Sequence, residues 1–176
     1  PKEDFPQGVK DLPASVICAL YDAGFYVRFT DENLGPHNKY YWTMSEYPES
    51  LVLTLDDDVV YPSKLIERYI KANKRWPDAV IGMRTHLITT EHGNIAPYAS
   101  WKHVQDEIID VPSHRIMLTG VSGALYPKHS LDVHCFDING IRNCCLYADD
   151  LWLKIMELAA DTKVVCPSDG FKLNYI

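Results

Sequence analysis

The run SLVLTL, residues 50–55, constrains the fold more than any other segment of the chain. Its nearly continuous apolar character is typical of a strand that is covered on both faces. Three aspartates follow it directly, and Pro62 then stands where the first turn of a helix, PSKLIERYIKANKRW, can begin. A buried strand that leads into an amphipathic helix indicates an α/β domain with a mostly parallel sheet.

The rest of the chain alternates between the same two kinds of element. Helices are predicted over residues 12–24, within NKYYWTMSEY before Pro48, and over residues 149–160. Strands are predicted over residues 25–30, in AVIGMRTHLITT and in KVVCP, and RIMLTGVSGALYP should form a strand, a small-residue loop and a short strand. EHGN is predicted to be a turn, followed by an irregular insert. We therefore predict one domain over residues 1–176, with helices flanking a mixed, mostly parallel sheet.

The composition limits the possible partners and location. The net charge of −7 and the pI of about 5.4 oppose a phosphate backbone, so nucleic acid is a poor candidate. No apolar run approaches the roughly 20 residues that span a bilayer, and PKEDFPQG has no signal-peptide character. We expect a cytoplasmic protein without a transmembrane segment, peripheral to a membrane only through regions outside this sequence. The five cysteines have no C-x-x-C spacing and are predicted to be small buried thiols.

Asp56, Asp57 and Asp58 follow the predicted strand at the end where α/β sheets bind ligands. Neighbouring carboxylates repel one another unless a cation neutralises them, and Mg²⁺ or Mn²⁺ prefers such oxygen ligands. Because residues i and i+2 of an extended segment point the same way, we predict that Asp56 and Asp58 bind the metal and that Asp57 turns aside. The alternatives are an exposed acidic turn or a cap for the following helix.

A second acidic pair, Asp149 and Asp150, opens the predicted helix in YADDLWLKIMELA. Acidic residues in a first turn complement the helix dipole and need no other role. A carboxylate in that position, if it faces a cleft, is also well placed to act as a general base for a hydroxyl nucleophile.

Two further segments supply candidate ligand contacts. Gly120, Ser122 and Gly123 lie close together in TGVSGALYP, where small residues either let a backbone approach a ligand or form a tight turn. Lys39 in LGPHNKY is a cation that could meet phosphate or a nucleotide base, or a solvated surface lysine.

Taken in order, LGPHNKY, LVLTLDDDVVYP, TGVSGALYP and YADDLWL resemble the inverting nucleotide-sugar glycosyltransferases of the GT-A fold, of the broad family-2 type. The resemblance runs from residue 4 to residue 165. It implies a Rossmann-like nucleotide-diphospho-sugar transferase fold, here truncated before the strand-helix-strand unit that builds the nucleotide-base pocket. It also implies a UDP- or GDP-sugar donor, a saccharide or other hydroxyl acceptor, and a place in polysaccharide biosynthesis.

The resemblance assigns roles to the candidate residues. Asp56 and Asp58 would hold Mn²⁺ or Mg²⁺ with the donor diphosphate, and Asp57 would lie close to the ribose or sugar. Asp150, with Asp149 beside it, would deprotonate the acceptor hydroxyl for an inverting attack on the anomeric carbon. The donor-binding set is completed by Lys39, Gly120, Ser122 and Gly123.

The histidines depart from the family pattern. Many members carry a late histidine as a further metal ligand, whereas the last one here, His134, precedes the acidic pair, so the third ligand is unassigned. The other candidates have no i, i+4 metal spacing and are predicted to be structural or solvated; they are His86, His92, His103, His114 and His129.

Two alternatives remain open. DDDVV also satisfies D-x-D-x-V, the motif of haloacid dehalogenase-like phosphatases, in which Asp56 would be the nucleophile and Asp58 the general acid. Thr119, Lys128 and the acidic pair would fill the remaining roles, although two elements precede the motif here and those enzymes usually carry it on their first strand. The other alternative is a non-catalytic remnant that binds a sugar nucleotide without transferring the sugar.

Overall fold

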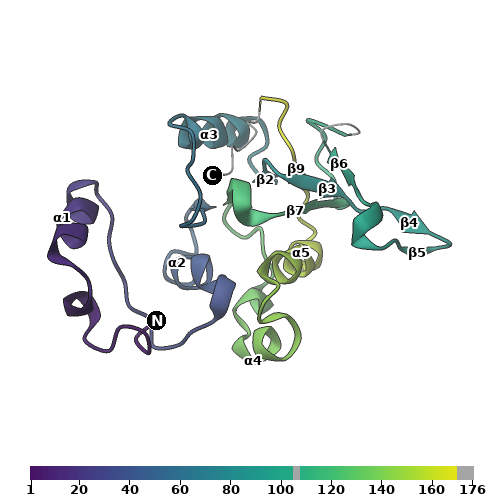
Figure 1. Cartoon of the computed structure of the whole chain (residues 1–176). Coiled ribbons are helices and arrows are strands. Elements are labelled where there is room, and N and C mark those ends of the chain that lie inside the picture. The colour runs from purple at the N-terminus through teal and green to yellow at the C-terminus, as the bar shows by residue number, and fades with distance from the viewer. Residues whose placement is uncertain (105–107, 170–176) are drawn as a thin grey trace. The chain divides into compact units, whose positions relative to one another are not determined.

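The computed structural model describes residues 1–104 and 108–169 (Figure 1). The chain divides into two compact units, the first ending at Gly35 and the second beginning at Pro36. Helices and a mixed sheet make up the second unit, so the predicted α/β class is confirmed. The finer GT-A assignment and the single catalytic domain over residues 1–176 stay predictions.

The first unit contains one α-helix, α1 (Ala14–Asp22), which confirms the helix predicted over residues 12–24. The strand predicted over residues 25–30 is wrong, because the structure describes no strand in this unit. Phe25 and Tyr26 are 61% and 86% exposed, so the aromatic alternation that suggested a strand has no sheet to pack on.

The central sheet of the second unit has the strand order β1-β8-β2-β9. β1 (Val52–Thr54), β2 (Val80–Gly82) and β9 (Val164–Val165) run in one direction, and β8 (Ala124–Tyr126) runs antiparallel between β1 and β2. Among the described strands only the β2–β9 pairing is parallel, so the sheet is mixed as predicted but its pairing is not mostly parallel. β1 confirms the strand predicted over residues 50–55, but in the described sheet it is an edge strand. Val52 belongs to the core cluster on one face and Leu53 packs against the cluster on the other, so the strand is covered on both faces as predicted. The predicted coverage is wrong for Leu51 and Leu55, which lie outside β1 and are 39% and 37% exposed.

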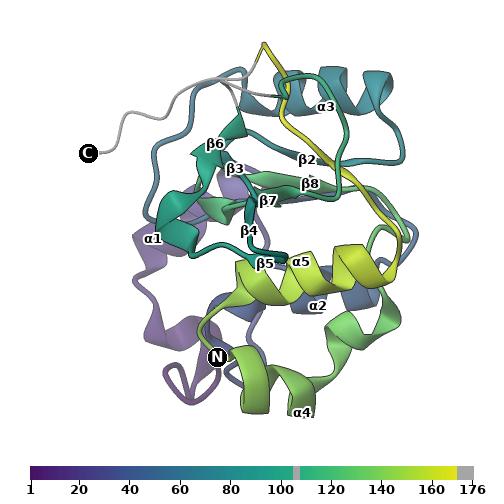
Figure 2. The ribbon, with the colours of Figure 1, turned by 90° about the vertical axis from the view of Figure 1, so that its right-hand side faces the viewer.

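Helices cover both faces of this sheet (Figure 2). On one face α3 (Leu65–Arg75) packs Leu65, Tyr69 and Ala72 into a core cluster that includes residues of β2 and β8. On the other face, α2 (Tyr41–Glu46) and α5 (Asp149–Ala159) contribute to the larger core cluster. All three helices were predicted from the sequence, α3 and α5 as amphipathic helices and α2 as a short helix before Pro48.

The predicted details of α3 need two corrections. The helix begins at Leu65 rather than at Pro62, whose carbonyl accepts the Leu65 amide at 2.9 Å in the turn before the helix. The apolar spacing of this segment places Ile66 and Ile70 on one stripe with Leu65 and Tyr69 and predicts that all four are buried, but Ile66 and Ile70 are 64% and 38% exposed.

The single strand predicted in AVIGMRTHLITT is wrong, because two strands form there. β2 ends at Gly82, and β3 (Thr85–Leu87) joins a second sheet of order β6-β3-β7, with β6 (Lys102–His103) and β7 (Ile116–Leu118). The predicted EHGN turn is confirmed between β4 (Thr90–Glu91) and β5 (Asn94–Ile95). The short α4 (Ile138–Gly140) and the π-helical turn Ile141–Cys145 after it were not predicted. Residues 105–107 of the predicted irregular insert lie outside the described residues.

The cysteine prediction holds for three residues and fails for two. Cys135, Cys145 and Cys166 are buried, whereas Cys18 and Cys144 are exposed. Within the part of the chain that the structure describes, no helix combines the length and apolar character needed to cross a bilayer.

Candidate functional site

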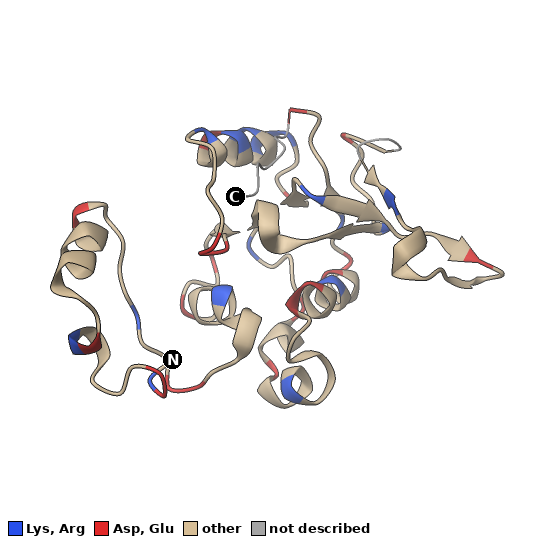
Figure 3. Cartoon of the chain, in the orientation of Figure 1, with Lys and Arg blue, Asp and Glu red and all other residues tan. Residues whose placement is uncertain are grey.

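The candidate residues come from four segments that meet at the end of β1. Asp56, Asp57 and Asp58 follow this strand, and α5 begins with Asp149 and Asp150. Figure 3 shows both segments as acidic stretches of the ribbon. The loop between β7 and β8 and the short helix Gly35–Lys39 supply the other two segments.

Lys39 joins the two acidic motifs. Its Nζ lies 3.2 Å from Oδ1 of Asp56 and 2.8 Å from Oδ2 of Asp149. The side chains of Lys39, Asp56 and Asp149 are only 20%, 25% and 10% exposed. The lysine is therefore a half-buried counter-ion, which excludes the solvated surface lysine considered from the sequence.

The loop glycine completes the cluster. The Gly120 amide donates a hydrogen bond to Oδ1 of Asp150 at 3.0 Å. A Cβ at position 120 would lie 2.8 Å from Nζ of Lys39 and 3.2 Å from Oδ1 of Asp150. A side chain at this position would displace the end of the lysine or the carboxylate, so glycine suits the close approach of this backbone to the protein's own side chains. The approach of the same backbone to a ligand stays a prediction.

Burial and charge shift the proton affinities of these groups. Burial raises the pKa of Asp150 to about 6, and the charge of Asp149 adds to the effect, while Lys39 and the Gly120 amide oppose it. Burial alone would lower the pKa of Lys39, but the neighbouring Asp149, Asp150 and Asp56 outweigh it and raise the pKa well above its ordinary value. Lys39 therefore stays charged at neutral pH. Asp150 is ionised at neutral pH and takes up a proton when the pH falls to about 6.

Two tyrosines hold the segments of the site in place. The Asp56 amide donates to the Tyr61 hydroxyl at 2.9 Å, and that hydroxyl donates to the Val121 carbonyl at 3.0 Å. Tyr69, on α3, donates to the carbonyls of Ser122 and Gly123 at 3.0 and 2.7 Å. These bonds fix the turn after β1 against the small-residue loop.

The remaining predicted residues lie around this cluster with different exposures. Ser122 is buried, and Gly123 has a φ of 87°, the left-handed region that favours glycine. Both act at least as parts of a tight turn, the alternative considered from the sequence. Asp57 and Asp58 are exposed, whereas Asp56 is half-buried.

The carboxylates at the end of β1 have the oxygen atoms that a hard divalent cation prefers as ligands. The described side chains do not supply enough ligands to complete the coordination of such a cation. Among residues 1–104 and 108–169, no group of three or more His, Cys, Asp or Glu side chains could hold a metal ion. Mg²⁺ commonly binds through one or two carboxylates and completes its shell with substrate phosphate oxygens and water. Asp57 and Asp58 lie in an exposed turn after the strand, which is the alternative considered from the sequence, so the extended geometry that would point Asp56 and Asp58 the same way is wrong. The binding of one metal ion by Asp56 and Asp58 stays a prediction, and Lys39 is a cation beside Asp56.

The histidines have contacts elsewhere in the molecule. The rings of His86 and His103 contact each other at a tilt of 38° with centroids 4.7 Å apart. His114 lies 3.2 Å from Asp161, and His129 lies 3.1 Å from Glu49. These contacts agree with the predicted structural or solvated roles and leave the third metal ligand unassigned.

The register of β1 and β8 bears on the phosphatase alternative. Thr54 at the end of β1 pairs with Ala124, and Val52 at its start pairs with Tyr126. Lys128 follows Tyr126 and contacts Glu49 at 3.2 Å, so it lies past the opposite end of β1 from Asp56. Lys128 cannot complete a phosphatase site there, which weakens that reading.

Sequence reasoning missed the residues that orient the site. Tyr61 was passed over although it stands five residues from Asp56, because nothing in the sequence shows that its hydroxyl reaches Val121. His37 was also missed; it is fully buried, and its Nδ1 and Nε2 contact the Tyr40 hydroxyl and the Cys145 carbonyl at 3.0 and 2.9 Å. It fixes the segment that carries Lys39.

No family model matches the chain, and neither a curated protein nor a solved structure matches it.

Proposed function

We propose that the chain is a glycosyltransferase that moves a sugar from a nucleotide-diphosphate donor to a hydroxyl acceptor with inversion. The observation that supports this most is the joining of two acidic motifs, distant in the sequence, in one cluster. Lys39 contacts Asp56 and Asp149, and Asp150 accepts the Gly120 amide beside them.

Asp150 is the proposed general base. Its Oδ1 is occupied by the Gly120 amide, so Oδ2 would take the proton of the acceptor hydroxyl. The acceptor oxygen then forms a bond to the anomeric carbon while the bond from that carbon to the diphosphate breaks, and the nucleoside diphosphate leaves. A base with a pKa of about 6 is mostly ionised at pH 7 and still has useful proton affinity.

Asp149 is the proposed positioning residue for Lys39. Its side chain is 10% exposed, and its Oδ2 lies 2.8 Å from the lysine Nζ, so it has little room for an acceptor. The negative charge of Asp149 also raises the pKa of Asp150. The two adjacent carboxylates therefore have different proposed tasks.

The donor diphosphate would meet Lys39 at the end of β1, within a cluster whose carboxylates outnumber this single cation. Lys39 would neutralise part of the charge on the leaving group, and Asp56 and Asp58 would hold Mn²⁺ or Mg²⁺ against its oxygens. When bound, such an ion supplies charge neutralisation to the departing diphosphate. In this proposal Asp57 lies beside the ribose or sugar, and Gly120, Ser122 and Gly123 line the donor sugar.

The first experiment is calorimetric titration with UDP- and GDP-sugars, with and without Mn²⁺. We expect binding that strengthens with Mn²⁺ and that falls by at least tenfold in Asp56→Asn and in Asp58→Asn. Asp78→Asn, an exposed position just after α3, is the matched control and should bind as the natural chain does. Metal-independent binding, or binding unchanged by both site substitutions, would contradict the assignment.

The second experiment separates binding from chemistry. Asp150→Asn should abolish transfer to a hydroxyl acceptor while leaving donor affinity within a few-fold, because the asparagine oxygen can still accept the Gly120 amide. Transfer by the natural chain should decline as the pH falls through about 6. Donor binding without transfer under any condition would favour the non-catalytic alternative, and trapping of beryllium fluoride on Asp56 with Mg²⁺ would favour the phosphatase.

A further inference from the structure

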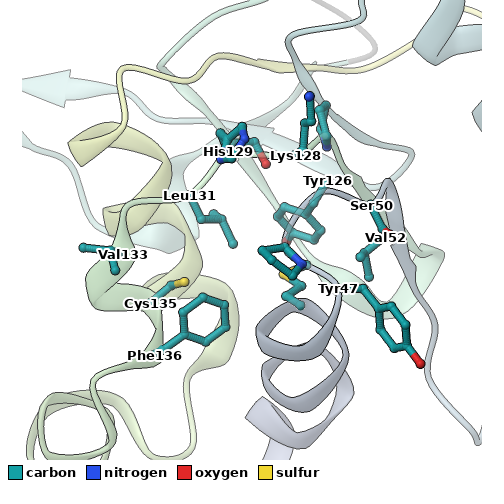
Figure 4. A pocket seen from close by; sticks show the side chains of 14 residues that line it. Tyr47, Ser50, Val52, Tyr126, Lys128, His129, Leu131, Val133, Cys135 and Phe136 are labelled. Carbon is teal, nitrogen blue, oxygen red and sulfur yellow. The ribbon is translucent and has the colours of Figure 1, made fainter.

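A pocket separate from the carboxylate cluster opens at the other end of β1 and β8 (Figure 4). It is lined by Val52 and Tyr126, which pair at the start of β1, whereas Asp56 follows the end of that strand. Its volume is about 230 Å³. We propose that this pocket binds a small molecule that has an apolar body and a carboxylate.

The walls of the pocket suit an apolar body. Figure 4 shows Leu131, Val133 and Phe136 on one side and Tyr47 and Val52 on the other. A cavity of about 150 Å³ holds benzene, so this one accommodates a body of roughly ten non-hydrogen atoms. The remaining apolar lining comes from Met44, Pro48 and Pro127.

Cys135, at the base of this lining, belongs to the same apolar surface. Burial, followed by the charge of Asp132, raises the pKa of its thiol to about 12. The thiol is therefore protonated at neutral pH and is not a nucleophile, so the pocket binds its ligand without a covalent bond to cysteine.

One polar group in the lining lacks a partner. Ser130 is 5% exposed, and within the described residues its buried hydroxyl has no hydrogen-bond partner. Buried hydroxyls in folded proteins are nearly always bonded, because burying one without a partner is unfavourable. The Ser130 oxygen is covered, so its side chain must rotate toward the pocket before a polar atom of a bound molecule can supply the missing partner.

The charges at the rim select a carboxylate. Lys128 and His129 both line the pocket, and both turn to the same group, with Nζ of Lys128 3.2 Å from Oε2 of Glu49 and Nε2 of His129 3.1 Å from its Oε1. These side chains are more than half exposed, so the contact is weak and exchangeable. The rim therefore already receives a carboxylate from the protein, and a ligand carboxylate can replace it.

The test uses 3-phenylpropionate and its neutral amide, 3-phenylpropanamide, as matched probes in a methyl-detected NMR titration. We expect 3-phenylpropionate to shift the methyl signals of Val52, Leu131 and Val133 with a dissociation constant of about 1 mM or tighter, a reasonable affinity for so small a ligand. The methyl signals of Ile81, on the α3 side of the sheet, should not move. The amide should bind several-fold more weakly.

Four variants make the prediction directional. Ser130→Ala should weaken 3-phenylpropionate binding by about threefold to tenfold, the effect of one hydrogen bond, whereas Ser100→Ala, an exposed serine outside the pocket, should have no effect. Lys128→Gln should weaken binding by about twofold to fivefold. Glu49→Gln should strengthen it, because the competing carboxylate is gone.

The outcomes separate the parts of the proposal. The unliganded methyl spectrum of each variant checks that it folds, and Ser130→Ala should fold well because it only removes an unpaired hydroxyl. Absence of shifts up to about 10 mM 3-phenylpropionate would overturn the binding site. Equal binding of acid and amide, or weaker binding in Glu49→Gln, would overturn the carboxylate, and an unchanged affinity in Ser130→Ala would overturn the role of that hydroxyl. None of these results depends on the proposed glycosyl transfer.

Discussion

Asp150→Asn should make the protein more stable at alkaline pH while it removes the proposed catalytic base. The folded protein holds this carboxyl at a pKa of about 6, against an ordinary value of 3.8, because burial and Asp149 disfavour its charged form. A difference of about two between the folded and unfolded pKa values corresponds to about 3 kcal/mol. That free energy is the cost of keeping Asp150 ionised in the folded state.

The pH dependence follows from the sign of this shift. A raised folded pKa gives stability that is fully present below about pH 4 and is lost as the pH rises through about 6. Asparagine never ionises, so the free energy of unfolding of Asp150→Asn should exceed that of the natural chain by about 3 kcal/mol at pH 8. The two values should match near pH 3.5. Burial also raises the pKa of Glu157, and the charge of Asp150 raises it further. Asp150→Asn removes that charge, which makes the ionised form of Glu157 less unfavourable and also stabilises the folded variant at alkaline pH.

The assay is urea unfolding of both proteins at pH 8, 6 and 3.5, with the free energy of unfolding extrapolated to water. Asp132→Asn is the control of opposite sign, because the backbone amide and ring of His134 hold the pKa of Asp132 below its ordinary value. The free energy of unfolding of this control should fall below that of the natural chain at pH 8, and the difference should shrink at pH 3.5. If Asp150→Asn is no more stable than the natural chain at pH 8 while the control behaves as expected, the burial argument for Asp150 is wrong.

Three further substitutions test the contacts around Lys39. Lys39→Met leaves Asp149 buried without its cation, so we expect a loss of about 3 kcal/mol in urea unfolding at pH 7. Gly120→Ala places a Cβ 2.8 Å from the lysine Nζ, and it should lower donor affinity at least tenfold by calorimetry. It should cost less stability than Lys39→Met, since the long lysine side chain can shift and still leave its charge near Asp149. Tyr61→Phe removes a hydroxyl that accepts the Asp56 amide and donates to a loop carbonyl, and it should destabilise the protein by about 1 to 2 kcal/mol in urea.

The sequence predicts local features of this site well, because they depend on neighbouring residues. An apolar run forms β1, acidic residues open α5, and small residues form the turn between β7 and β8. Each of these elements is determined by a few consecutive residues, so hydrophobic periodicity and turn-forming residues are enough to predict it.

The wrong predictions concern features that depend on contacts between residues far apart in the sequence. Residues 25–30 have the composition of a strand, but a strand needs a neighbour, and the first unit offers none among its residues. The sequence around Lys39 is compatible with a solvated surface lysine, because its contacts with Asp56 and Asp149 form only in the folded chain. The apolar spacing of α3 predicts a stripe, yet only the packing partners determine that Leu65 and Tyr69 are buried and Ile66 is not.

Lys39 also changes the argument about charge that the triple aspartate raises. Repulsion among these carboxylates requires a cation, and the fold provides one from the chain itself, with its pKa raised so that it stays charged. The cluster of Asp56, Asp149 and Asp150 is thereby partly neutralised before any ligand binds. A donor diphosphate would bring additional negative charge, which one lysine cannot offset. The need for a divalent ion should therefore appear with the donor rather than before it, so metal and donor should bind cooperatively, each weakly alone.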